Sequence, residues 1–231
     1  MARLPDPAPV LPDWQAYRMV PSHFPPINIF ETVLSADEFE LAAEIEGLTN
    51  DRLRDEIGDI SRVANEDRVF GPGSSPVMAA FTHVGKGSRF TDGSYGVYYA
   101  ASSLDAAIRE TAYHRERFLA ATQDPPMELT MRCYINRVIL PMDDIRGPGF
   151  EALHDPDVTC YPVSQQWAGE RRNQGSHGLL YNSVRHPGSE CIAAFRPTAV
   201  GIPWQGPHLR YVWDGQRITD VFRISSHRIL P

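Results

Sequence analysis

The chain has 231 residues, of which 42% are hydrophobic and 22% are charged, and its formal net charge is −7. These values are typical of a globular protein of one large domain, or one domain with an appendage. Lys86 is the only lysine, and no dense basic run is present to grip a long nucleic acid, so we expect a small phosphorylated ligand held by arginines.

The first 65 residues are expected to form an N-terminal arm followed by helices. Residues 1–34 are rich in proline but carry bulky apolar side chains such as Trp14 and Tyr17, so we expect the arm to lie on the protein or on a partner. Ser35 is a good N-cap for the amphipathic segment after it, and a second short helix is expected at 49–57. We therefore divide the chain at residue 65, with the main domain spanning 66–231.

The first elements of the main domain surround a glycine-rich segment. GPGSSP at 71–76 predicts a loop, VMAAF at 77–81 a short buried strand, and VYYAA at 97–101 a second strand. A helix is expected at 103–121, with Ser102 and Asp105 in capping-box register. Its apolar stripe comprises Leu104, Ala107, Ile108, Thr111 and Phe118, and Arg115 is among the residues that face away.

Strand patterns predominate after this helix. They are expected within 127–142, 178–183, 189–195 and 209–224, with one helix beginning near residues 164–167. Asp214 and Gly215 stand between alternating runs and predict a hairpin. The chain is thus expected to have an α+β fold, with a mixed, mostly antiparallel sheet and flanking helices.

Residues suited to ligand binding or catalysis are concentrated in the glycine-rich turn, the strand after it and the helix that follows. Arg89 lies in a glycine-rich turn, Tyr99 on the following strand, and Glu110 two turns into the helix, with His114 one turn further on the same face. Small neighbours leave room for a ligand beside Glu110. Each residue can also have a purely structural role, so the pattern alone indicates a candidate cluster and not a reaction.

The segments GSRF, VYYAAS and AAIRETAYH, followed by Ser183 in GLLYNSVRHPG, resemble the RES domain family in order and spacing. The resemblance covers about residues 66–200 and implies an ADP-ribosyltransferase-like fold. It also implies a toxin that consumes NAD and is neutralised by an Xre-type antitoxin. Features similar to the ParT-type branch imply ADP-ribose transfer to a protein, with phosphoribosyl pyrophosphate synthetase as the acceptor. NAD loss by hydrolysis or phosphorolysis, without a protein acceptor, stays open.

The resemblance also implies roles for individual residues. Glu110 would stabilise the oxocarbenium ion formed when nicotinamide leaves, and Arg89 would clamp a phosphate. Tyr99 would flank the nicotinamide or its ribose, and Ser183 would position Glu110 or the ligand. Further ligand contacts are expected from Phe90, Tyr98, Asn182 and Arg185. The family has another arginine upstream, for which His83 and Arg68 are the candidates and His83 is preferred by position.

Other classes of site and partner are not expected. The three cysteines, Cys133, Cys160 and Cys191, are widely separated and form no metal-ligand pattern, so we expect reduced thiols and no metal. Without a signal-like or membrane-length apolar run, we expect a cytoplasmic protein. A ribonuclease toxin and a non-catalytic binding module remain as alternatives of a different class.

Overall fold

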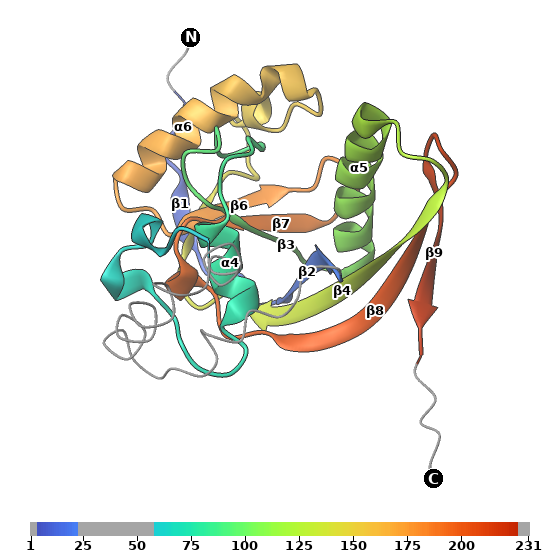
Figure 1. Ribbon diagram of the computed structural model, residues 1–231. Helices are drawn as coiled ribbons and strands as arrows, with labels where there is room; N and C mark the ends of the chain where they lie inside the picture. Colours follow the sequence, from blue (N-terminus) through green and yellow to red (C-terminus); the bar gives the residue numbers. More distant parts are fainter. Residues whose placement is uncertain (1–3, 23–57, 226–231) are drawn as a thin grey trace.

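The computed structural model of the protein describes residues 4–22 and 58–225. Within these ranges, nine strands form one sheet in the order β1-β5-β6-β7-β3-β2-β4-β8-β9. Neighbouring strands are antiparallel except for the parallel pair β5 and β6. Helix α6 lies at the upper left of the view in Figure 1 and α5 at the right, and α5 contacts the central strands β2 and β3. The predicted α+β class, with a mixed and mostly antiparallel sheet, is confirmed.

The strands are β1 (Ala8–Val10), β2 (Gln15–Pro21), β3 (Tyr98–Ala101), β4 (Met127–Arg137), β5 (Met142–Asp144), β6 (Gly178–Asn182), β7 (Glu190–Ala194), β8 (Trp204–Trp213) and β9 (Ile218–Ile224). The α-helices of the described ranges are α4 (Ser75–Thr82), α5 (Leu104–Thr122) and α6 (Tyr161–Asn173). Short 3₁₀ turns lie at Ile60–Arg62, Asn65–Asp67, Glu151–Leu153, Val158–Cys160 and Pro197–Ala199.

Successive residues of a strand point to opposite faces of the sheet. Both faces are covered here, so side chains are buried on each. On β6, Leu179 and Tyr181 belong to a cluster that also contains Ala107 of α5 and Ala168 of α6. Leu180 belongs instead to the cluster formed with α4. The helices α5 and α6 therefore cover one face of the central strands, and α4 packs against the other.

Two strands of the expected N-terminal arm belong to this sheet. β2 pairs with β4 from Gln15 to Pro21, and it pairs with β3 only between Tyr17 and Ala101. Of the two expectations for the arm, packing on the protein holds for these residues. The helices expected after Ser35 and at 49–57 lie outside the described residues, and a boundary at residue 65 stays a prediction.

The strand predicted for 77–81 was wrong, because these residues lie in helix α4. A short apolar run fits a buried helix as well as a buried strand. Pro76 stands in the first turn of α4, where its fixed backbone angle favours a helix start. The side chains of Val77, Met78 and Phe81 on this helix are buried. The helix also includes the last two residues of the expected GPGSSP loop.

The long helix and the final hairpin are confirmed, with local differences. Ser103, and not Ser102, caps α5 by accepting a hydrogen bond from the Ala106 amide at 3.2 Å. The hairpin between β8 and β9 turns through residues 214–217, with Gly215 at a φ of +100°. Helix α6 begins at Tyr161, three residues before the predicted position.

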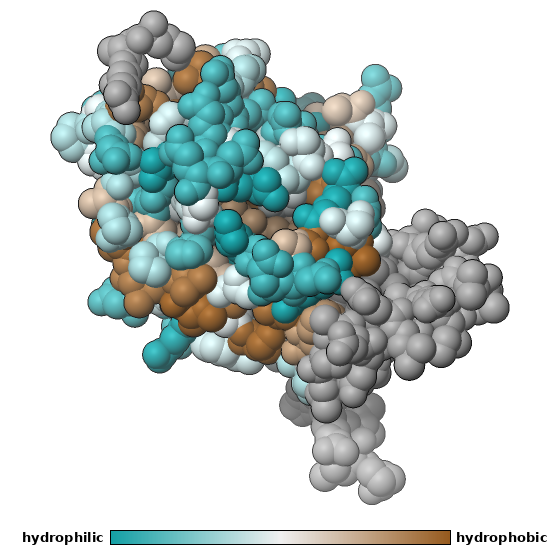
Figure 2. Space-filling model, turned by 90° about the vertical axis from the view of Figure 1, so that its left-hand side faces the viewer, coloured by the Kyte–Doolittle hydropathy of each residue, from teal (hydrophilic) through white to brown (hydrophobic). Residues whose placement is uncertain are grey.

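The surface is mixed in character. On the face shown in Figure 2, hydrophilic residues cover much of the upper part and hydrophobic residues gather along the lower part. Among the described helices, none is long and apolar enough to span a bilayer.

Candidate active site

A pocket of about 990 Å³ opens between α5, strands β2 and β3, and the loop that follows α4. Its volume is at the upper end of the roughly 300–1,000 Å³ that small-molecule and cofactor sites occupy. The pocket walls include four of the predicted site residues, His83, Arg89, Tyr99 and Glu110. The fold therefore gathers these residues at one cavity.

Helix α5 supplies one continuous wall of the pocket. Its lining residues are Ala107, Glu110, Thr111, His114, Arg115 and Phe118. Their spacing of three or four residues places them on one helix face. Two of them depart from the sequence prediction: Arg115 was expected to face away, and Phe118 was expected in an apolar core but is 45% exposed.

The Glu110 carboxylate is oriented by Ser183, which follows β6. The Ser183 hydroxyl donates to Glu110 Oε1 at 2.6 Å. The same hydroxyl oxygen accepts hydrogen bonds from the amides of Arg185 and His186, and Ser183 is only 6% exposed. Within residues 4–22 and 58–225, Glu110 has no other hydrogen-bond or ion-pair partner. Ser183 thus holds one carboxylate oxygen from behind and leaves the other for a ligand.

Arg89 is a buried cation without a carboxylate partner among the described residues. Its Nη1 donates to the carbonyl oxygens of Leu153 at 3.2 Å and Asp155 at 2.6 Å. Its guanidinium carbon lies 4.7 Å from the ring centroid of Tyr161, and the residue is 7% exposed. These contacts fix the position of the charge but do not neutralise it. An anionic ligand in the pocket would do so.

Tyr99 holds the turn that carries Arg89. Its hydroxyl lies 2.8 Å from Ser88 Oγ and accepts a hydrogen bond from the Phe90 amide at 3.1 Å. Burial raises the pKa of Tyr99, so it stays protonated at neutral pH. Tyr99 lines the pocket, but its hydroxyl is engaged by the protein.

Arg18 of β2 is a pocket residue that the sequence prediction missed. Its Nη1 donates to the Tyr99 carbonyl at 3.2 Å, where β2 and β3 have ceased to pair. Its guanidinium carbon lies 4.5 Å from the Tyr98 ring centroid, and its Nε is buried without a partner. Desolvation lowers the pKa of Arg18. No carboxylate of the described chain pairs with it, so within the described residues Arg18 and Arg89 are two cations at one cavity that lack an ion-pair partner.

The two candidates for the upstream cation are placed differently. His83, at the C-terminus of α4, is exposed and lies on the pocket wall, whereas Arg68 does not line the pocket. Arg18 is the more suitable permanent cation, because an arginine stays charged at every physiological pH. Its position 50 residues upstream of Arg68, in the Pro-rich arm, is why the sequence offered no signal for it.

Four other predicted ligand residues do not line the pocket. Phe90 and Tyr98 are fully buried. Asn182 donates its side-chain amide to the Arg146 carbonyl at 3.0 Å. Arg185 stacks on Tyr113, with 3.4 Å between its guanidinium carbon and the ring centroid, and donates to the Pro156 carbonyl.

His114 shares a pocket face with Glu110, as predicted, but the region around it is electropositive. Although the side chain keeps exposed surface, enclosure and the charges of nearby arginines lower its pKa to about 4. These arginines are Arg185, Arg117, Arg89 and Arg115. His114 is therefore neutral at pH 7.

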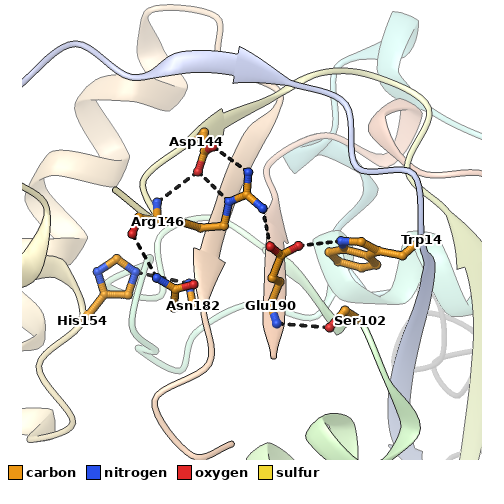
Figure 3. A network of polar contacts seen from close by, with 7 residues as sticks. All are labelled: Trp14, Ser102, Asp144, Arg146, His154, Asn182 and Glu190. Atoms are coloured by element: carbon orange, nitrogen blue, oxygen red, sulfur yellow. Dashed lines mark hydrogen bonds and ion pairs between the residues drawn. The ribbon is translucent and has the colours of Figure 1, made fainter. Parts of the chain in front are cut away.

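A polar network ties the segments that carry the site together (Figure 3). Glu190 of β7 accepts from Trp14 Nε1 at 2.8 Å and forms an ion pair with Arg146. Arg146 also pairs with Asp144, at 2.7 Å between Nη2 and Oδ2. The Glu190 amide donates to Ser102 Oγ at 3.1 Å, just before α5. The network joins the arm that bears Arg18 to the start of the helix that bears Glu110.

The family model of the RES domain matches residues 65–214 of this chain. The chain belongs to the RES domain family. A protein of Sinorhizobium fredii described as uncharacterized protein y4oC is 32% identical over 205 residues, which cover 88% of this chain and 84% of that protein. Among solved structures, the toxin–antitoxin complex MbcT-MbcA of M. tuberculosis gives a TM-score of 0.43 at 10% identity, over 94% of this chain and 87% of that one.

This RES domain therefore places the Glu110 carboxylate in one pocket of cofactor size with Arg18 and Arg89, neither of which has a carboxylate partner among the described residues. Such an arrangement can hold an anionic ligand and stabilise a positive charge that develops beside Glu110. Within the described part of the chain, no three His, Cys, Asp or Glu side chains are grouped as metal ligands would be.

Proposed function

We propose that this RES domain protein is a toxin that consumes NAD by cleaving the nicotinamide–ribose bond and transfers ADP-ribose to a protein. The observation that carries the proposal is the Ser183-held carboxylate of Glu110 in a pocket that also contains Arg18 and Arg89. NAD matches this set, because it has a diphosphate for the arginines and a glycosidic carbon that becomes cationic.

The chemistry fits the groups that line the site. As the bond from ribose C1′ to the nicotinamide nitrogen breaks, its electron pair stays with the nitrogen, and nicotinamide leaves as a neutral molecule without a general acid. The remaining oxocarbenium ion is stabilised by a fixed negative charge. Glu110 supplies that charge, oriented by the hydrogen bond from Ser183. A nucleophile of the acceptor protein then bonds to C1′ and loses its proton to solvent.

Binding of the diphosphate is assigned to Arg89 and Arg18. Both are anchored through contacts to backbone carbonyls, so their charges are pre-positioned before the ligand arrives. A buried cation costs free energy unless it is paired, and an anionic ligand removes that cost only when bound. This difference favours a doubly charged phosphate ligand over a neutral one.

The partners are proposed from membership of the RES domain family and from the resemblance of GSRFTDGSYG to the ParT-type branch. They are an Xre-type antitoxin and, as acceptor, phosphoribosyl pyrophosphate synthetase. Hydrolysis or phosphorolysis of NAD without an acceptor uses the same first step, with water or phosphate as the nucleophile at C1′. The acceptor therefore has to be identified by the products.

The test follows nicotinamide release and protein labelling when the purified chain is incubated with labelled NAD, with and without cell lysate. We expect nicotinamide release that falls at least about 100-fold in Glu110→Gln, the scale of losing an electrostatic transition-state contact. Glu66→Gln, which changes an exposed carboxylate, is the matched control. Labelled protein indicates transfer, whereas free ADP-ribose or its phosphorylated form indicates hydrolysis or phosphorolysis.

Two outcomes would replace the proposal. Cleaved RNA with intact NAD would indicate the ribonuclease alternative, although a neutral His114 is poorly suited to act as its general acid. Equal toxicity of the wild type and a folded Glu110→Gln variant would indicate a binding module.

A further inference from the structure

The pocket continues well beyond Glu110 along helix α5. Glu110 and Phe118 both line it and are eight residues apart on a continuous helix. At a rise of about 1.5 Å per residue, their positions are separated by about 12 Å along the helix axis. The pocket therefore has room for an elongated ligand, with a second chemical group at the C-terminal end of α5.

The far end of the pocket has an exposed aromatic ring, that of Phe118. Phe118 is 45% exposed, although burying a phenylalanine ring stabilises a fold by about 1.5–3 kcal/mol. The Lys86 ammonium lies 5.1 Å from the centroid of this ring. Lys86 is itself exposed and is the only lysine of the chain. An aromatic face beside a flexible cation suits a planar base attached to a phosphate.

We infer that Phe118 and Lys86 form the subsite for the adenosine half of the dinucleotide, with the adenine stacked on Phe118. This inference rests on the proposed function, which places the reacting ribose at Glu110. On binding, the Lys86 ammonium leaves the ring and pairs with the adenylate phosphate. The reacting sugar then lies at Glu110 and the base at Phe118, and Arg18 and Arg89 of the same pocket bind the diphosphate.

The chain offers a closely matched control for this subsite. Phe222 on β9 is 47% exposed and has a cation, the Arg210 guanidinium, at 5.1 Å from its ring centroid. Phe222 does not line the pocket. Phe118→Ala and Phe222→Ala thus remove rings of similar exposure that each lie beside a cation, and only the first alters the proposed subsite. Phe118→Trp retains a stacking surface and is the rescue variant.

The test measures binding of AMP and of nicotinamide mononucleotide, the two halves of NAD, by titration calorimetry on the full chain. Phe118→Ala is expected to weaken AMP binding about 5- to 100-fold, the usual range for one stacked base. Binding of nicotinamide mononucleotide stays unchanged. Phe118→Trp and Phe222→Ala bind AMP like the wild type. With NAD as substrate, Phe118→Ala raises KM by a similar factor and leaves kcat within about twofold.

The outcomes separate the two proposals. No AMP binding to the wild type, or the same affinity in Phe118→Ala, overturns the subsite whether or not NAD is cleaved. An equal loss for both halves of NAD also overturns it, because that result indicates a general collapse of the pocket. Phe118-dependent AMP binding without nicotinamide release would retain the subsite and reject the proposed reaction.

Discussion

Ser183 and Glu110 are 73 residues apart in the sequence, and the hydroxyl of the first donates to the carboxylate of the second at 2.6 Å. The same hydroxyl accepts from the amides of Arg185 and His186, so its proton has a defined direction. A hydroxyl whose lone pairs and proton are all engaged is a positioning group and a poor nucleophile. This arrangement agrees with the proposed role of Ser183.

Ser183→Ala is expected to lower kcat for nicotinamide release about 10- to 100-fold, because a hydrogen bond to a charged group contributes about 1.5–3 kcal/mol. KM for NAD changes little. Ser176→Ala is the matched control, since Ser176 also makes local hydrogen bonds, but at the opposite end of β6. Steady-state kinetics measure kcat and KM for both variants. Equal effects of the two substitutions would contradict a positioning role for Ser183.

Arg18→Met is expected to raise KM for NAD at least tenfold while changing the free energy of unfolding by less than about 1 kcal/mol. The variant loses one hydrogen bond to the Tyr99 carbonyl but also removes a desolvated guanidinium whose Nε has no partner. Urea unfolding and steady-state kinetics measure the two quantities. Arg137→Met, an exposed change on β4, serves as the control. A strongly destabilised Arg18→Met protein would assign Arg18 a structural role instead.

Tyr99→Phe is expected to destabilise the protein by about 1–2 kcal/mol, because the Phe90 amide and Ser88 hydroxyl both lose their partner. We expect KM for NAD to rise, since the freed turn carries Arg89, and kcat to fall less than in Ser183→Ala. Tyr134→Phe on β4 is the corresponding control. Unchanged stability combined with a large loss of kcat would mean that the Tyr99 hydroxyl acts on the substrate.

Asp144→Asn is expected to reduce stability more at neutral pH than at low pH. Hydrogen bonds and charge from Arg146 lower the pKa of Asp144 in the folded state. The ionised carboxylate therefore stabilises the fold above its unfolded pKa of about 3.9, and this contribution is lost as the pH falls through the lower folded value. Urea unfolding should show a difference of about 1 kcal/mol at pH 7 that is smaller at pH 3. Asp220→Asn, an exposed change on β9, is the matched control, and a constant difference for Asp144→Asn would be against the ion-pair explanation.

The sequence predicted the elements that carry Arg89, Tyr99 and Glu110 because these residues lie on or beside a short strand and a well-capped helix within one continuous segment. Helix α5 could be predicted from its 3.6-residue periodicity and its serine cap. The strand predicted at 77–81 was wrong because a short apolar run carries no period that separates a strand from a buried helix. The prediction that Phe118 packs in the core was wrong. An apolar stripe shows which face of a helix is buried, but it does not show how far along the helix the covering residues extend.

The amino-acid sequence by itself determined the α+β class, the helix that bears Glu110 and membership of the RES domain family, all of which depend on local patterns and their order. Only the tertiary structure decided that Arg18 enters the pocket and that Tyr99 turns its hydroxyl to the Arg89 loop. It also decided that Ser183 contacts Glu110 from behind. The physical reason is that β2 lies between β3 and β4, which are both far from it in the sequence. The sequence of β2 does not indicate which strands it pairs with. The local sequence provides the charged residues, and the order of the strands decides where those charges lie.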